Sequence, residues 1–119
     1  MAQTLDKSER LSGKTAISRL VEKGRWSSIP GFRFCCLAPN SAEKNRIMIS
    51  VPKKLFKRAV KRNLLKRRIR EAYRTQKDLL RHKDGFCDIL FQYNSTEIMS
   101  YEDIKASLAS IFKLLSEPK

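Results

Sequence analysis

The sequence predicts a single domain of the α+β class, with helices packed on a small sheet. At 119 residues the chain is long enough for one compact domain and too short for two. Hydrophobic residues make up 41% of it, which is enough for a core. Segments with helical and with strand periodicity follow one another in the order α-β-β-α-β-α. Residues 1–9 are polar and are expected to be flexible, so the folded domain is expected to span residues 10–119.

The first expected element is a helix from about residue 12 to residue 23. Ser12 can cap its first turn, and Gly24 marks its end, as glycine commonly does. The apolar residues of this segment fall at i, i+3 and i+4 on one face, namely Ile17, Leu20 and Val21.

Two strands are expected next, at residues 32–37 and 46–51. The first is rich in aromatic and thiol side chains, and the second alternates apolar and polar residues up to Pro52. We interpret the two as a hairpin, with a turn at Pro39-Asn40-Ser41 and a polar loop over residues 42–45. The fold class also allows a further short strand near residues 25–28.

A long helix without glycine or proline is expected from about residue 54 to residue 81. The dipeptide Asp84-Gly85 then turns the chain into a strand at residues 86–93. The last helix follows a capping-box spacing of Ser100 and Asp103, and Pro118 lies past its end. Its apolar residues recur at helical spacing: Ile104, Leu108, Ile111, Phe112 and Leu115.

The charge of the chain predicts a polyanionic partner. The formal net charge is +14 and the pI about 10.2, which favours RNA, DNA or an anionic membrane surface. No apolar run approaches the roughly 20 residues that span a bilayer. The N-terminal residues lack the apolar region of a secretory signal, so we expect a cytoplasmic protein.

The cysteines do not predict a metal site. Cys35, Cys36 and Cys87 form no CxxC pair, and with one histidine the chain falls short of the four close ligands that zinc needs. Cys35 and Cys36 are neighbours, so in a strand they point to opposite faces. We expect reduced, partly buried thiols.

Most of the positive charge lies in one segment. Between Lys53 and Arg74 eleven basic residues stand against the single acid Glu71, a net of about +10. On a helical wheel of about 100° per residue, the sector of roughly 140° that carries the charge is followed by an apolar sector that packs on the sheet. The charged sector holds Arg62, Asn63, Lys66, Arg67, Arg70 and Arg74, and the apolar one Leu65, Ile69, Ala72 and Leu79.

Such a face favours binding to phosphate groups. The arginine fork binds phosphate oxygens bidentately and stacks on bases. Repulsion between like charges at i, i+4 spacing disfavours an empty solvated helix. A merely solvated basic face is the alternative, and the lack of interspersed acids argues against it.

The segment from Arg58 to Arg74 resembles the arginine-asparagine-arginine signature of the protein subunit of bacterial ribonuclease P. That pattern reads R-N-x-x-K-R-x-x-R followed by an aromatic residue. It is matched by Arg62, Asn63, Lys66, Arg67, Arg70 and Tyr73. Upstream, Ser50-Val51-Pro52-Lys53-Lys54 resembles the end of a strand and the double lysine of this family, and a weaker resemblance runs from about Arg10 to Phe112.

The resemblance implies a left-handed β-α-β crossover that contains the basic helix. It implies that an RNA subunit holding Mg²⁺ hydrolyses the phosphodiester bond, and that the polypeptide is not the catalyst and binds no metal or cofactor tightly. The expected partners are ribonuclease P RNA and precursor tRNA with its 5′ leader, with no obligatory protein partner. The expected RNA-binding residues are Lys53, Lys54, Arg58, Arg62, Asn63, Lys66, Arg67, Arg70 and Arg74.

The resemblance also implies a cleft between the first helix and the sheet that receives the leader. The family often places phenylalanine at positions matching Ile17 and Val21, and a tyrosine at Cys35, so this sequence departs from the pattern. Trp26, Phe32 or Phe34 could supply the missing rings. Core packing is the alternative for Ile17, Leu20 and Val21. The expected cleft residues are Ile17, Val21, Phe32, Phe34 and Cys35.

Other functional classes fit less well. A metal-assisted nuclease needs clustered carboxylates, and the acids do not cluster in the basic segment. His82 stands alone, which disfavours a ribonuclease of the histidine-pair kind. No helix-turn-helix, zinc finger or leucine zipper supports DNA binding. A ribosomal or general RNA-binding protein remains the alternative, and only the signature separates it from ribonuclease P.

Overall fold

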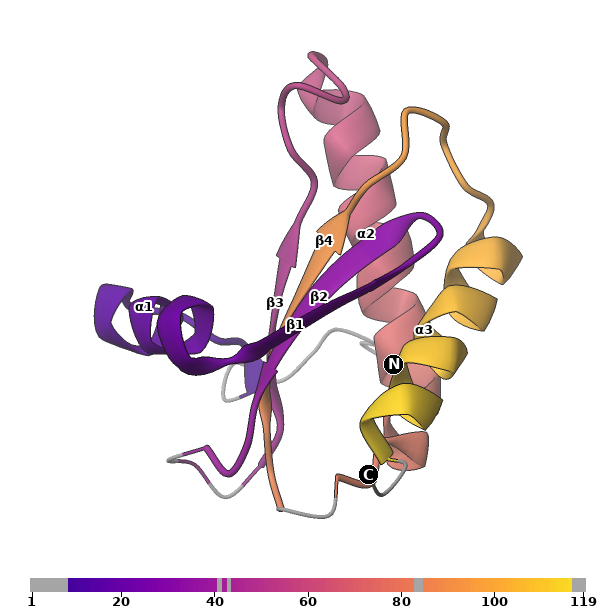
Figure 1. Cartoon of the computed structure of the whole chain (residues 1–119). Helices are drawn as coiled ribbons and strands as arrows, with labels where there is room; N and C mark the ends of the chain where they lie inside the picture. The colour runs from indigo at the N-terminus through magenta and orange to yellow at the C-terminus, as the bar shows by residue number, and fades with distance from the viewer. Residues whose placement is uncertain (1–8, 41, 43, 83–84, 117–119) are drawn as a thin grey trace.

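A four-stranded sheet separates one helix from two others. The computed structural model describes residues 9–40, 42, 44–82 and 85–116. Helix α1 (Lys14–Lys23) lies on one face of the sheet, and α2 (Ala59–Gln76) and α3 (Tyr101–Ser116) lie on the other (Figure 1). This confirms the α+β class. The expected flexible segment, residues 1–9, lies outside the described residues except for Glu9.

The strands are β1 (Arg25–Ile29), β2 (Phe32–Leu37), β3 (Arg46–Ser50) and β4 (Asp88–Tyr93), in the spatial order β1-β2-β4-β3. The further short strand is confirmed as β1, which forms an antiparallel hairpin with β2. The expected hairpin of residues 32–37 with 46–51 is wrong, because β4 lies between β2 and β3. Five of the six β4 side chains are buried, because β4 is central in the sheet and helices cover both faces of the sheet there.

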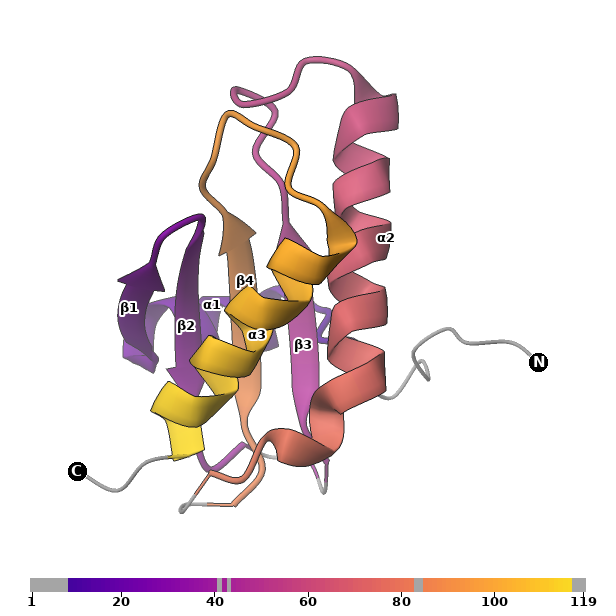
Figure 2. The same cartoon turned by 90° about the vertical axis from the view of Figure 1, so that its right-hand side faces the viewer.

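The connection from β3 through α2 to β4 joins two parallel neighbouring strands. In Figure 2 α2 is nearer the viewer than the sheet, both strands run upward, and β4 lies to the left of β3. The crossover is therefore left-handed, as the resemblance implied and against the right-handed rule for such units.

Helix α2 is shorter than the expected helix of residues 54–81. It begins after the N-cap Arg58 and ends at Gln76, where a 3-10 helix, η2 (Lys77–Leu79), continues the chain. The preceding residues form a turn closed by the Leu55 amide, which donates to the Pro52 carbonyl at 3.1 Å. This turn lets Phe56 enter the core, and burial of its ring outweighs the helix propensity of the residues around it.

Other element boundaries also differ from expectation. Helix α1 begins at Lys14 and not at Ser12, because Gly13 with φ of 93° precedes it and no side chain caps it. Phe86 is outside β4 and 48% exposed. Half of the capping box is present, since the Asp103 amide donates to Ser100 Oγ at 3.1 Å. The turn residues Ser41 and Asp84 and the terminal Pro118 lie outside the described residues.

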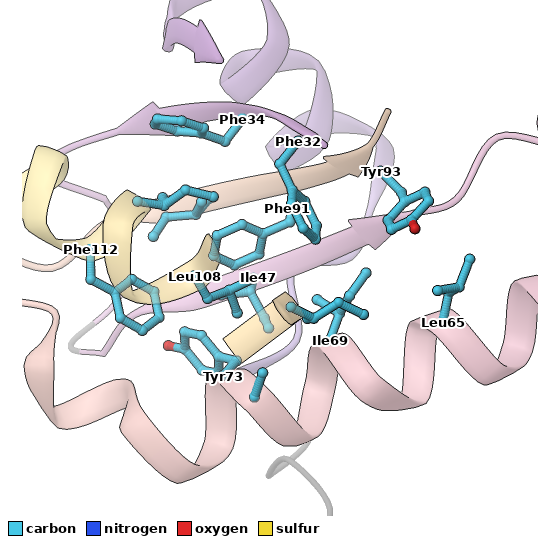
Figure 3. Packing of buried hydrophobic residues seen from close by; sticks show 14 of the residues in the cluster. Phe32, Phe34, Ile47, Leu65, Ile69, Tyr73, Phe91, Tyr93, Leu108 and Phe112 are labelled. Carbon is cyan, nitrogen blue, oxygen red and sulfur yellow. The ribbon is translucent and has the colours of Figure 1, made fainter. Parts of the chain in front are cut away.

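The main core lies between the sheet and the α2–α3 layer. Figure 3 shows side chains of both helices facing the rings of β2 and β4, with Tyr73 near Phe112. A smaller core lies between α1 and the other face and contains Leu11, Leu20, Cys35 and Leu90. The large core includes Phe32, Phe34, Ile47, Leu65, Ile69, Tyr73, Phe91, Tyr93, Leu108 and Phe112.

The two cores confirm that Cys35 and Cys36 point to opposite faces of the sheet, and the thiols are more deeply buried than expected. Cys35 belongs to the core under α1 and Cys36 to the opposite one. Cys35, Cys36 and Cys87 are all free and buried. Within the part of the chain that the structure describes, no helix is long and apolar enough to cross a membrane.

Candidate nucleic-acid interface

Helix α2 is anchored by one side. Leu65, Ile69 and Ala72 are fully buried, as the wheel predicts, whereas Leu79 is 59% exposed because η2 has left the helical path. Gln76 adds a polar anchor, since its Nε2 donates to the Lys105 carbonyl of α3 at 2.8 Å. The opposite side of α2 is therefore held rigidly toward solvent.

The predicted RNA-binding residues lie along this outer side and in the turn before it. Lys53 and Lys54 are exposed in the turn, and Arg58 is exposed at the N-cap. Helical spacing of four places two rows of residues beside each other on α2. One row is Arg62, Lys66, Arg70 and Arg74, which are half-buried, and the other is Asn63 and Arg67, which are exposed.

Three arginines of α2 form hydrogen bonds or an ion pair with other groups of the protein. Arg62 Nη1 donates to the Phe56 and Lys57 carbonyls, each at 2.8 Å, and so holds the turn before the helix. Arg68 Nη1 donates to the Met99 carbonyl at 2.6 Å. Arg74 pairs with Glu71 one turn earlier. The hydrogen bond from Arg74 holds the pKa of the Glu71 carboxyl below its usual value.

Three other cations of the signature have no acidic partner. Lys66, Arg67 and Arg70 form no ion pair with any acid among the described residues. Burial, then the charges of Arg10 and Arg67, lower the pKa of Arg70. Uncompensated repulsion of this kind is relieved when an anion binds. We call Arg10, Lys66, Arg67 and Arg70 the cationic face.

Sequence reasoning did not assign Arg10. It reaches α2 because the chain before α1 forms a parallel bridge between Arg10 and Ile47, and the Leu11 amide donates to the Ile47 carbonyl at 2.8 Å. Only the sheet topology brings these residues together. No local pattern around residue 10 contains that information.

The residues expected in the leader cleft do not gather in one place. Val21 is 42% exposed on α1, and Ile17 is half-buried against the small core. Cys35 is fully buried, and its Sγ donates to the Leu20 carbonyl at 3.3 Å, so it is part of that core. Phe32 and Phe34 are buried on the other face of the sheet and cannot line a cleft beside α1.

Trp26 supplies a ring on the α1 side of the sheet. It pairs with Cys35 across the β1–β2 ladder, and its indole Nε1 donates to the Val21 carbonyl at 3.2 Å. The Arg33 guanidinium lies 4.1 Å from the ring centroid, a cation–π contact. Gln92 stands opposite Arg33 on β4. If the pairing of β1 with β2 had been predicted from the sequence, strand alternation would have placed Arg33 and Trp26 on the same face of the sheet.

The described residues include no group of three or more histidine, cysteine, aspartate or glutamate side chains that could hold a metal ion. The side chains of the interface carry positive charge, hydrogen-bond donors and a stacking surface.

Known proteins resemble this chain in sequence and in fold. The family model for ribonuclease P matches residues 5–116. The ribonuclease P protein component of Porphyromonas gingivalis is 32% identical over 110 residues, covering 87% of this chain and 80% of the relative. That of Borrelia hermsii is 34% identical over 106 residues, covering 85% and 86%.

Solved structures agree with these matches. The ribonuclease P protein of Staphylococcus aureus superimposes with a TM-score of 0.78 at 26% identity, over 93% of this chain and all of that one. The protein of Thermotoga maritima gives a TM-score of 0.76 at 23% identity, over 92% and 99%. The second match speaks for the fold alone.

Proposed function

Because the chain belongs to the ribonuclease P protein family, we propose that it binds ribonuclease P RNA and precursor tRNA and assists the Mg²⁺-dependent removal of the tRNA 5′ leader. The family itself implies the RNA partner. We add as proposals that the chain binds precursor tRNA and its leader, and that the RNA subunit and not the protein performs the catalysis.

The cationic face is the observation that carries it. Lys66, Arg67 and Arg70 match the family signature and lack acidic partners among the described residues, and the charges of Arg10 and Arg67 act on Arg70. Each phosphate that such a cation neutralises releases condensed counterions, which favours RNA binding and makes it salt-dependent. The rigid anchoring of α2 on the core fixes the spacing of these groups before RNA arrives.

Catalysis belongs to the RNA subunit in this proposal. The chemistry that Mg²⁺ held by that RNA would supply is activation of a water molecule and stabilisation of the leaving oxygen. The protein's cations lower the repulsion between the phosphates of the two RNAs, which favours substrate docking and occupancy of the Mg²⁺ sites. The polypeptide performs no bond cleavage itself.

The leader would contact Trp26 and Arg33. An indole ring and a guanidinium plane both stack on unpaired bases, and these two side chains are already stacked on each other beside α1. They stand in for the phenylalanines that the family often places where Ile17 and Val21 occur. A base could continue the stack on the exposed side of Arg33.

The test is cleavage of a precursor tRNA by a bacterial ribonuclease P RNA at low Mg²⁺, with and without this protein. The expected result is protein-dependent release of the leader at the mature 5′ end. The triple variant Lys66→Ala, Arg67→Ala, Arg70→Ala should lose this stimulation while its far-UV circular dichroism stays native. Absence of stimulation by the native protein, with tight binding to other RNAs, would favour a ribosomal or general RNA-binding protein instead.

A further inference from the structure

A cavity of about 360 Å³ lies away from the α1 side of the sheet, where the β2–β3 and α2–β4 connections meet. The first connection contributes Asn45, and the second contributes Lys77, Arg81 and Phe86. Glu9, before α1, closes one side. Its volume falls in the range of pockets that hold small organic ligands, and a nucleobase with its ribose is of that size.

Phe86 gives the cavity an exposed aromatic surface. Its side chain is 48% exposed, and it is the one aromatic residue among the large exposed hydrophobic side chains of the described chain. The next residue, Cys87, is fully buried, so the backbone beneath the ring is held in place. An exposed ring in a basic RNA-binding protein suits stacking on an unpaired base.

Two residues that line the cavity, Asn45 and Arg81, carry donors that a ligand can use. The Cys87 amide donates to Asn45 Oδ1 at 2.9 Å, which directs the Asn45 Nδ2 donors elsewhere, and they meet no partner in the described chain. Arg81 is exposed and pairs with no acid among the described residues. Its backbone amide donates to Ser116 Oγ at 2.9 Å, which ties this segment to α3.

The cavity adjoins the cationic face through two consecutive residues. Arg10 lies close enough to Arg70 to lower its pKa, and Glu9 pairs with Lys77 at 2.6 Å. Glu9 and Asp78 also line the cavity, so its interior is not simply cationic. A neutral base inside with its phosphate at the rim fits this charge distribution better than an acidic peptide does.

We propose that this cavity binds one unstacked nucleotide of RNA, with its base on Phe86, a base carbonyl accepting from Asn45 Nδ2, and its phosphate at Arg81. The proposal rests on the RNA-binding function proposed above and extends it to a second single-stranded contact, separate from the stacked pair Trp26 and Arg33. RNA bound along α2 would reach the cavity past Arg70 and Arg10.

The test is a titration of the ¹⁵N-labelled full chain with the single-stranded hexamer rU₆, followed by amide chemical shifts. The amides of Asn45 and Leu80 report on the cavity, and that of Trp26 reports on the proposed leader contact. We expect Phe86→Leu to weaken binding at the cavity amides roughly fivefold or more, because it removes the stacking ring. Phe86→Tyr keeps the ring and should change this affinity by less than about twofold. A hexamer of abasic ribose phosphates should leave the cavity amides unshifted.

Two results would overturn the proposal. One is that rU₆ shifts amides of α2 or of Trp26 while those of the cavity stay still. The other is that the abasic hexamer shifts the cavity amides as rU₆ does and Phe86→Leu changes nothing, which would mean a site for phosphate alone. Stimulation of precursor tRNA cleavage is measured separately. A protein that stimulates cleavage without a Phe86-dependent site contradicts only this inference, and the reverse result contradicts only the proposed function.

Discussion

Arg46 and Asp88 form a two-point ion pair across the first register position of the parallel strands β3 and β4. Arg46 Nε and Nη2 each lie 2.8 Å from one carboxylate oxygen. The Asp88 side chain is 1% exposed, and Asn40 Nδ2 donates to it at 3.0 Å. A one-residue shift of either strand would break both bonds, so the pair fixes the register of the only parallel ladder between named strands.

Replacing Arg46 should therefore destabilise the fold strongly. Arg46→Met leaves the buried Asp88 carboxylate with Asn40 as its side-chain donor, and we expect a loss of about 3 kcal/mol in the free energy of unfolding by urea. Arg46→Lys keeps the charge without the fork and should fall between. Arg19→Met, at an exposed position of α1, is the control, with a change within about 0.5 kcal/mol. Equal stability of Arg46→Met and the wild type would mean that register is fixed elsewhere.

The neighbours Arg67 and Arg68 should respond in opposite ways. Arg67 is exposed on the cationic face, so Arg67→Gln should weaken RNA binding and reduce the slope of log K against log salt by roughly 0.7–0.9. Arg68 holds the Met99 carbonyl, so Arg68→Met should cost about 1–2 kcal/mol of stability and leave the slope unchanged. Fluorescence anisotropy at several salt concentrations and urea unfolding measure the two effects. Lys113→Gln on α3 controls for a change in net charge.

Trp26 should matter for the leader and not for the body of the tRNA. Trp26→Leu removes the ring beneath Arg33, and we expect at least roughly fivefold weaker binding of precursor tRNA by the reconstituted ribonucleoprotein. Binding of mature tRNA, which has no leader, should be unchanged, and Trp26→Phe should retain most of the affinity. Equal losses for precursor and mature tRNA would place Trp26 outside the leader path.

Cys35 should make the fold sensitive to alkaline pH. Burial raises the pKa of its thiol from 9.0 to about 11. The folded state thus keeps the thiol proton to a higher pH than the unfolded chain does. The contribution of Cys35 to the free energy of unfolding is therefore complete below pH 9 and is lost as the pH rises toward 11. Between pH 8 and pH 10.5 the wild type should lose about 2 kcal/mol more stability than Cys35→Ala. Parallel stability curves for the two proteins would show that the thiol does not carry this dependence.

Gly24 should tolerate no side chain. A Cβ at this position would lie 2.4 Å from the Leu20 carbonyl oxygen and 2.5 Å from Cys35 Sγ. Gly24→Ala should cost about 1–3 kcal/mol by overpacking. Adding Cys35→Ala removes one of the two clashes, so the double variant should be less destabilised than the sum of the single ones. Strict additivity would argue that the thiol does not press on this residue.

Gly24 also shows what sequence reasoning could and could not supply. The pattern correctly predicted that α1 ends there, but its usual reason is a left-handed backbone, and Gly24 has φ of −72°. The glycine is needed because β2 passes close by, which is a tertiary fact. The same limit explains β4: its apolar residues predicted a buried strand, yet nothing local indicated that it would pair with both β2 and β3.

The residues of the candidate site likewise fall into those that local spacing predicts and those that only tertiary contacts place. The signature on α2 could be assigned because helical spacing alone puts its residues on one side. Phe32 and Phe34 were assigned to the wrong face of the sheet. Alternation shows that they share a face, but the sequence does not show which helices cover that face. The position of Arg10 and the cavity beside Phe86 depend on contacts between segments far apart in the chain. The periodicity of the sequence carries no information about such contacts.

The central place of β4 bears on how the nascent chain folds at the ribosome. The strands β1, β2 and β3 are synthesised first, but the strand that joins β2 to β3 is absent until residues 88–93 leave the exit tunnel. Before that moment the hairpin β1–β2 and the segment β3–α2 cannot join into one sheet. The emerging polypeptide therefore carries its arginine-rich helix, with open strand edges, for the whole interval in which β4 is being translated. The sheet can be completed only after β4 is made, and a chain released before β4 would be a cationic fragment with unpaired strand edges.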